Sequence, residues 1–94
     1  MTFTVTKIID GDTFEVTPGW KWNNEEGSIV RALGYDTPEK GQMGHDEAAN
    51  RLKQLINGKN VELKNPVKLT YGRLLCDVYI NGKNIASYFK KYKI

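Results

Sequence analysis

Polar and apolar residues alternate along several short stretches of the chain, and a period of two is typical of half-buried β-strands. The same stretches are rich in β-branched and aromatic residues, which favour strands. Five strands are predicted, over residues 5–9, 13–17, 28–35, 60–64 and 72–80. The Asp10-Gly11 pair joins the first two strands as a β-hairpin, and Pro18-Gly19 is predicted to end the second. Thr37-Pro38 stops the third, because proline lacks an N–H and restricts the residue before it.

One stretch has the period of an amphipathic helix instead, over residues 46–57. The apolar residues that fall on one face of this helix are Ala48, Leu52, Leu55 and Ile56. Asp46 is a suitable N-cap residue, and Gly58 is suited to the position just past the helix end. A second, short helix is predicted over residues 85–91.

The order of three strands, one helix and two strands, in a chain of 94 residues, predicts a mainly-β fold. We expect a five-stranded Greek-key barrel of the OB type, in which the helix between strands three and four plugs one end. A chain of this length forms one domain, over residues 1–94. Residues 20–27 are predicted to form a polar loop or irregular ribbon, with one of Trp20 and Trp22 facing the core and the other facing solvent.

The charges are unevenly distributed, although the net charge is only +3. Residues 1–50 carry four Lys or Arg against nine Asp or Glu, and residues 51–94 carry ten against two. An acidic first half and a basic second half suit a site where a cation and a polyanion meet. Solubilising lysines scattered over the surface are the alternative, and for the C-terminal lysines both interpretations stay open.

Membrane insertion is not expected, because no apolar stretch approaches the roughly 20 residues that span a bilayer. The N-terminus also lacks the charged and apolar regions of a signal peptide. We therefore expect a cytoplasmic protein if the sequence is complete, and a secreted one if a leader has been removed. A monomer is expected.

The single cysteine and the single histidine exclude two kinds of site. Cys76 has no partner for an internal disulfide, and one thiol with one imidazole cannot form a Cys/His zinc site. Cys76 lies in an apolar run and is predicted to be buried. His45 follows a glycine-rich loop over residues 40–45 and is predicted to be an exposed polar residue, with a role in proton transfer as the alternative.

Three segments carry the residues that could do chemistry: 10–13, 31–39 and 71–73. Asp12 and Asp36 offer two carboxylates for a hard cation such as Ca²⁺, which prefers oxygen ligands. Arg31 and Arg73 could clamp a phosphate, because the guanidinium donors match phosphate oxygens bidentately. Glu39 could handle a proton. This is the inventory required to cut a phosphodiester bond with the help of a metal.

Each of these residues also has a simpler interpretation. Asp10 is best explained by the hairpin turn, with an indirect role at the site left open, whereas for Asp12 a ligand role is favoured over a turn role. Arg31 alone could be an edge-strand charge or an ion-pair partner, and Glu39 could orient water rather than accept a proton.

The ordered set of motifs resembles the staphylococcal, thermonuclease-like nuclease family, which adopts an OB-fold barrel. The resemblance covers nearly the whole chain, from Val5 to about Lys91. The motifs that carry it are Asp10-Gly11-Asp12-Thr13, Arg31 followed by Asp36-Thr37-Pro38-Glu39, Glu47-Ala48, Tyr71-Gly72-Arg73 and Gly82-Lys83.

The resemblance implies a role for individual residues. It implies that the metal is held by Asp12, Asp36 and the backbone carbonyl of Thr37. It implies that the catalytic residues are Arg31, Arg73 and Glu39, and that Tyr71 contacts the substrate. Lys68 could follow the phosphate backbone as a second substrate-binding residue, although a solvated surface lysine is the default interpretation.

The resemblance further implies a Ca²⁺-dependent endonuclease that hydrolyses single-stranded or unpaired DNA and RNA and leaves 3′-phosphate ends. Two alternatives from other classes stay open: an OB-fold module that binds nucleic acid with a dormant site, and a barrel that binds proteins. Cleavage in the presence of Ca²⁺ separates the enzyme from the dormant module, and salt-dependent binding of nucleic acid separates both from the protein-binding barrel.

Overall fold

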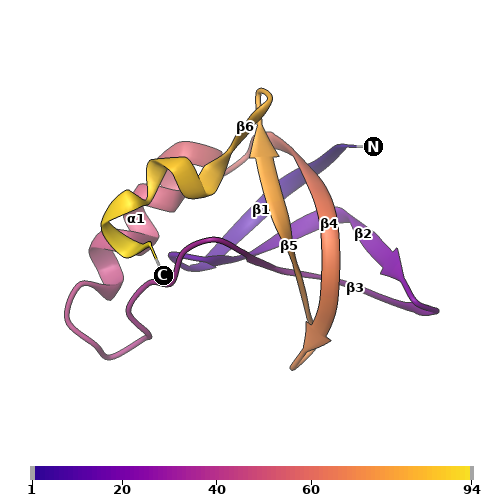
Figure 1. Cartoon of the computed structure of the whole chain (residues 1–94), viewed down its shortest axis with the longest axis horizontal. Helices are drawn as coiled ribbons and strands as arrows, with labels where there is room; N and C mark the ends of the chain where they lie inside the picture. The colour runs from indigo at the N-terminus through magenta and orange to yellow at the C-terminus, as the bar shows by residue number, and fades with distance from the viewer. Residues whose placement is uncertain (1, 94) are drawn as a thin grey trace.

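Long, curved strands make up about half of this protein, as a computed structural model that describes residues 2–93 shows (Figure 1). The strands are β1 (Thr2–Asp10), β2 (Thr13–Trp22), β3 (Glu25–Ala32), β4 (Asn60–Thr70), β5 (Arg73–Ile80) and β6 (Lys83–Asn84). The helix α1 (His45–Ile56) lies between β3 and β4, and two 3₁₀ turns, η1 (Ile85–Tyr88) and η2 (Lys90–Tyr92), follow β6.

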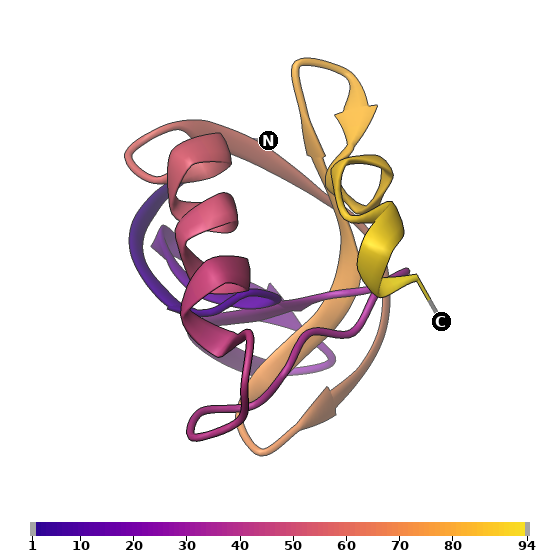
Figure 2. The same ribbon diagram turned by 90° about the vertical axis from the view of Figure 1, so that its left-hand side faces the viewer.

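The sheet closes on itself. Its strand order is β3-β2-β1-β4-β5-β6, and β3 additionally pairs with β5. The β3–β5 pairing is parallel, whereas the other neighbours are antiparallel. Figure 2 shows the resulting ring of strands with α1 across one end of it. The predicted five-stranded OB-type barrel, with one helix between the third and fourth strands, is confirmed.

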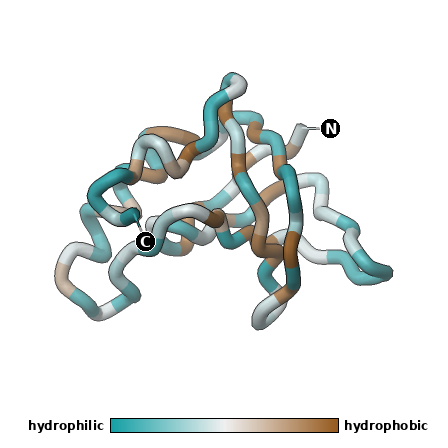
Figure 3. Tube along the Cα trace, viewed as in Figure 1, coloured by the Kyte–Doolittle hydropathy of each residue, from teal (hydrophilic) through white to brown (hydrophobic). Residues whose placement is uncertain are grey.

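Inward-facing side chains from every barrel strand fill the core. Along β5 the buried positions alternate strictly with half-buried ones, as the period of two predicts. The helix contributes its predicted apolar face, since Ala48, Leu52 and Ile56 are buried. Figure 3 shows the apolar segments along the barrel strands and the hydrophilic tip of the β2–β3 hairpin. Cys76 is buried as predicted, and burial, followed by the charge of Asp77, raises the pKa of its thiol to about 12.

The strand end predicted at Pro18-Gly19 and the loop predicted over residues 20–27 were wrong, whereas the prediction that one of the two tryptophans faces the core is confirmed. Pro18-Gly19 does not end the second strand, because β2 continues to Trp22 and turns through Asn23-Asn24 into β3. A register shift between Glu15 and Trp20 places the proline where the ladder is already irregular, so its missing N–H costs little. Trp20 is the tryptophan that faces the core, and its Nε1 donates to the carbonyl of Ile29 at 2.9 Å.

Several predicted boundaries also shift. The first strand begins earlier, at Thr2, and β4 runs to Thr70 rather than ending at residue 64, with a register shift between Lys64 and Lys68. The third strand ends at Ala32, three residues before the predicted end.

The ends of the helical segments differ from the prediction in their chemistry. The N-cap of α1 is Gly44 rather than Asp46, because the helix begins one residue earlier than expected, at His45. At the other end Gly58 has φ of 76°, a left-handed conformation that suits glycine, as predicted. The predicted C-terminal helix forms as the two 3₁₀ turns instead. Among residues 2–93, no helix is long and apolar enough to cross a membrane.

Candidate active site

A polar cleft of about 520 Å³ opens where the β1–β2 turn, the end of β3 and the start of β5 meet. The residues that line it are Asp10, Asp12, Arg31, Asp36, Thr37, Pro38, Glu39, Lys40 and Arg73. All five charged residues that the sequence singled out for chemistry are therefore in one place. They come from the three separate segments of the chain named above, and only the closed barrel brings them together.

Asp12 is the most firmly held carboxylate of the cleft. It occupies the second position of the two-residue turn between β1 and β2, and only 7% of it is exposed. The hydroxyl of Thr13 donates to Oδ1 at 3.0 Å, and the backbone N–H of Thr37 donates to Oδ2 at 3.3 Å. Because both oxygens accept bonds from fixed groups, the carboxylate is preorganised to face the cleft.

The turn that carries Asp12 is pressed against α1, and this explains the glycine at position 11. A Cβ added to Gly11 would lie 2.7 Å from the Cβ of Ala48 and 2.8 Å from Oγ1 of Thr37, and both distances are shorter than a Cβ tolerates to a carbon or oxygen atom. Tyr35 fixes the same turn, since its hydroxyl donates to the Gly11 carbonyl at 2.8 Å. Burial, followed by the charge of Asp12, raises the pKa of Tyr35, so this hydroxyl remains a donor.

Arg31 joins the two aspartates. Its Nη2 lies 3.2 Å from Oδ2 of Asp12 and 3.0 Å from Oδ1 of Asp36. Its Nη1 donates to the carbonyls of Ala32 and Tyr35, the latter at 3.0 Å. The guanidinium is thus held in place by four acceptors at the floor of the cleft, with 16% of the side chain exposed.

Arg73 and Glu39 lie at the rim and are less constrained. Arg73 donates from Nε to the carbonyl of Thr70 at 3.2 Å, which orients the guanidinium. Glu39 is exposed, but its backbone is fixed by Gln42: the Glu39 N–H donates to Oε1 of Gln42 at 2.8 Å, and the Gln42 N–H donates to the Glu39 carbonyl at 2.9 Å. Sequence reasoning missed Gln42, since a glutamine in a glycine-rich loop carries no signal of this reciprocal pair.

The donor set around Asp12 suits a hard cation. Asp12, Asp36 and Thr37 offer two carboxylates and further oxygens, which is the ligand type that Ca²⁺ and Mg²⁺ prefer. The buried hydroxyl of Thr37 has no hydrogen-bond partner among residues 2–93, so a polar atom beside Asp12 is left unsatisfied there. Within residues 2–93, no group of three or more His, Cys, Asp or Glu residues forms a metal site, so water would have to complete the coordination.

His45 was predicted to be exposed, and this prediction was wrong. Only 9% of the residue is exposed, because α1 begins at His45 and turns its ring toward the end of β1. Its Nε2 lies 2.8 Å from Oδ1 of Asp10, and its Nδ1 lies 3.1 Å from Oδ1 of Asp46. No local pattern indicates this contact, since Asp10 lies 35 positions away along the chain.

The two predicted substrate-binding residues do not line the cleft. Tyr71 is 94% exposed at the tip of the β4–β5 turn, with φ of 52°. Lys68 is exposed on β4. Both belong to the β4–β5 hairpin, which also carries Arg73. Their contact with substrate stays a prediction.

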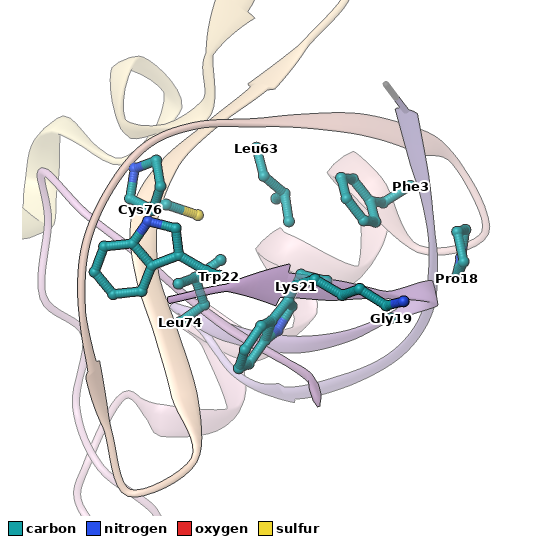
Figure 4. Close-up of a pocket in the computed structure, with 10 residues that line it drawn as sticks. Phe3, Pro18, Gly19, Lys21, Trp22, Leu63, Leu74 and Cys76 are labelled. Atoms are coloured by element: carbon teal, nitrogen blue, oxygen red, sulfur yellow. The ribbon is translucent and has the colours of Figure 1, made fainter. Parts of the chain in front are cut away.

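A second hollow, of about 450 Å³, has the opposite character (Figure 4). Strands β1, β2, β4 and β5 line it with mostly apolar side chains, including Phe3, Trp22, Leu63 and Leu74. The described residues that line it include no carboxylate, and Lys21 is the one charged residue among them. The groups that could handle a phosphodiester are therefore those of the polar cleft.

Comparison with known proteins shows the family of this chain. The family model described as staphylococcal nuclease homologue matches residues 29–91. The chain belongs to this family. The matched segment contains four of the five charged residues, while Asp12 precedes it. The family resemblance inferred from the motifs is confirmed.

Curated relatives of this staphylococcal nuclease homologue carry the name endonuclease. The chain is 34% identical over 91 residues to the SPbeta prophage-derived endonuclease YokF of Bacillus subtilis (strain 168), covering 87% of this chain and 29% of that protein. It is 34% identical over 91 residues to endonuclease YncB of the same strain, covering 87% and 41%. An uncharacterized endonuclease of Escherichia coli O157:H7 is 32% identical over 82 residues, covering 86% and 50%. The chain thus spans between 29% and 50% of the length of these relatives.

Proposed function

We propose that this staphylococcal nuclease homologue is a Ca²⁺-dependent endonuclease that hydrolyses single-stranded or unpaired DNA and RNA and leaves 3′-phosphate ends. The observation that supports this most directly is the meeting of Asp12, Asp36, Glu39, Arg31 and Arg73 in one cleft. The names of the relatives point in the same direction.

The carboxylates of Asp12 and Asp36, with the carbonyl of Thr37, are the groups that would hold a hard cation. Such a cation, when bound, would offset the negative charge of a non-bridging phosphate oxygen and would help to generate a nucleophile from water. Asp12 is buried and hydrogen-bonded, whereas Asp36 is exposed. Asp12 would therefore provide a fixed ligand and Asp36 an adjustable one.

The two arginines would bind the phosphate that is cut. Negative charge on the phosphoryl oxygens grows during attack, and preorganised guanidinium donors stabilise that charge more than they stabilise the bound substrate. Arg31 is already fixed by the carbonyls of Ala32 and Tyr35, so it needs little reorganisation. To reach a phosphate, its Nη2 would share or release one of the two aspartates.

Glu39 would act on the attacking water, as a general base or by orienting it. Its backbone is fixed by Gln42, while its side chain is exposed at the rim of the cleft. A carboxylate in this position can reach water without being buried.

One observation favours the alternative of a nucleic-acid-binding module with a dormant site. The ion pairs of Arg31 with Asp12 and Asp36 already balance part of the carboxylate charge inside the protein. A cleft balanced in this way could bind a single strand through Arg73 and Lys40 without cutting it.

A titration of cleavage with Ca²⁺ tests the proposal, on single-stranded DNA and RNA oligonucleotides side by side. We expect cutting that rises with Ca²⁺, fails with chelator and fails in Asp36→Ala, with 3′-phosphate ends identified by mass spectrometry. Binding measured by fluorescence anisotropy, with no cutting at millimolar Ca²⁺, would support the dormant module. Matched experiments with Mg²⁺ show whether the donor set accepts the smaller ion.

A further inference from the structure

The ring of His45 bridges the first turn of α1 and the end of β1. Its Nε2 lies 2.8 Å from Oδ1 of Asp10, and its Nδ1 lies 3.1 Å from Oδ1 of Asp46. A neutral imidazole has one N–H and can donate to only one of these carboxylates, whereas an imidazolium donates to both. The geometry therefore matches the protonated ring.

Asp10 connects this bridge to the cleft. It lines the cleft, lies two residues before Asp12 and pairs with Thr13 at the base of the turn. The register of the β1–β2 ladder shifts between Ile8 and Asp10, so regular strand pairing is interrupted where the turn begins. A side-chain contact at Asp10 thus supplies restraint that the ladder lacks there.

We propose that His45 is a positioning residue of the cleft: it holds Asp10 against α1, and so keeps the Gly11-Asp12 turn in its place. This inference rests on the proposed nuclease function for its effect on catalysis. The effect on the turn itself is independent of that function.

The opposite side of the turn is already fixed, which gives the His45 bond its importance. Tyr35 holds the Gly11 carbonyl, and Ala48 leaves no room behind Gly11. At the other end of the turn, Asp10 meets α1 through its hydrogen bond with His45. Loss of that contact lets the turn rotate about the fixed Gly11 and moves the carboxylate of Asp12.

The charges around His45 make the contact sensitive to pH. Asp10 from β1 and Asp46 from α1 face its two nitrogens. Lys40 of the preceding loop and Glu47 of α1 line a shallow hollow together with His45. The hydrogen bond with Asp10, followed by that with Asp46, raises the pKa of His45 above 6.5, against the effect of burial. Stabilisation by the imidazolium is therefore complete below pH 6.5 and is lost as the pH rises through the raised pKa of the folded protein.

Two variants and a control test the proposal. His45→Leu removes both bonds, while His45→Gln keeps an N–H donor near the position of Nε2. The control is Lys91→Met, which breaks the exposed 3.2 Å ion pair between Lys91 of η2 and Glu47. Glu47 lies in the same turn of α1 as His45, and Lys91 lies outside the cleft. Three measurements apply to each protein: amide hydrogen exchange over residues 10–13, cleavage rate, and its pH profile. In the wild type, NMR gives the pKa of the ring directly, because His45 is the only histidine.

We expect His45→Leu to speed exchange in the turn and to lower the cleavage rate on the order of 10–100-fold, as misplaced catalytic groups do. His45→Gln should recover most of the rate and lose the decline that the wild type shows as His45 deprotonates. Lys91→Met should match the wild type.

The proposal is overturned if turn exchange in His45→Leu equals that of the wild type, or if NMR places the pKa of His45 at or below 6.5. If the wild type does not cleave nucleic acid under any condition, the proposed function fails. Turn exchange and the NMR titration then still decide whether His45 holds the turn, so the two failures are distinguishable.

Discussion

Arg31 and Arg73 line the same cleft, yet the protein holds them in different ways. Arg31 has four acceptors within the barrel, two of them carboxylates. Arg73 is oriented by one bond, from Nε to the Thr70 carbonyl. Replacement by lysine keeps the charge but removes the fork of donors in both cases. The two variants should therefore agree in activity and differ in stability.

Arg73→Lys is expected to lower the cleavage rate by about 10²–10³, the typical effect of removing one preorganised donor. The midpoint of urea unfolding should stay close to that of the wild type, since only one bond to a rim carbonyl is lost. Parallel activity and unfolding measurements check both parts. A rate near that of the wild type would exclude Arg73 from the catalytic role.

Arg31→Lys is expected to lose a similar factor in rate and, in addition, to lower the free energy of unfolding by about 1–3 kcal/mol. The added cost arises because an ammonium cannot satisfy the Tyr35 carbonyl and both aspartates from one position. Far-UV circular dichroism should confirm that the barrel is retained. Equal unfolding midpoints for Arg31→Lys and Arg73→Lys would show that the four contacts of Arg31 add no stability.

Among single residues, the sequence predicted the functional ones that lie in short, recognisable motifs. Asp12 follows an Asp-Gly pair, and Glu39 follows a Thr-Pro pair, so both could be recognised locally. His45 and Gln42 could not be recognised in this way. The bond of His45 to Asp10 depends on how α1 docks on β1, and Gln42 acts through a backbone turn.

Among the elements, the β2–β3 hairpin shows how local rules can mislead. Pro18-Gly19 is a typical strand end, but here the ladder shifts register around it and the strand continues, with Trp20 packed in the core. The burial of one tryptophan outweighs the local preference for a break. Asn23 and Asn24 then form the turn with φ of 50° and 64°, the positive values of a type I′ hairpin.

Asn24→Gly is expected to raise the free energy of unfolding by a few tenths to about 1 kcal/mol, because glycine adopts positive φ without a Cβ clash. Part of the gain is offset by the greater freedom of glycine in the unfolded chain. Asn24→Val, with a β-branched side chain at the same φ, should lose about 1–2 kcal/mol. Urea unfolding measures both, and the reverse order would contradict the turn assignment.

Gly11→Ala tests the contact between the β1–β2 turn and α1. The new Cβ would meet Ala48 at 2.7 Å and Thr37 at 2.8 Å, so the turn must move off the helix. Overpacking of this kind typically costs about 1–3 kcal/mol. We also expect a loss of cleavage, since Asp12 moves with the turn. An unchanged unfolding midpoint would mean that α1 shifts freely, contrary to its buried face.

For the molecule as a whole, the decisive contact is the parallel pairing of β3 with β5. Arg31 lies opposite Leu75, and Arg73 lies two residues earlier on the same strand. No local sequence pattern predicts this pairing, because α1 and β4 lie between the two strands in the chain. The strands and helix could thus be predicted from periodicity, whereas the meeting of the charged residues followed only from the family resemblance.

The same closure places a further cation near the arginines. Leu75 pairs with Lys68 on one side and with Arg31 on the other, so all three side chains share one face of the sheet. Arg73, two residues from Leu75, points to that face as well. A single strand bound across this face would meet Lys68 after passing the cleft.

Binding of single-stranded DNA should therefore weaken with salt, with a slope of log K against log[salt] of about −0.7 for each phosphate contacted. Lys68→Ala is expected to flatten that slope by about 0.7, because one phosphate contact is lost. Lys53→Ala, an exposed lysine in the last turn of α1, removes the same charge away from this face and should leave the slope unchanged. Equal slopes for the two variants, measured by fluorescence anisotropy in chelator, would mean that net charge rather than the closed barrel guides the strand.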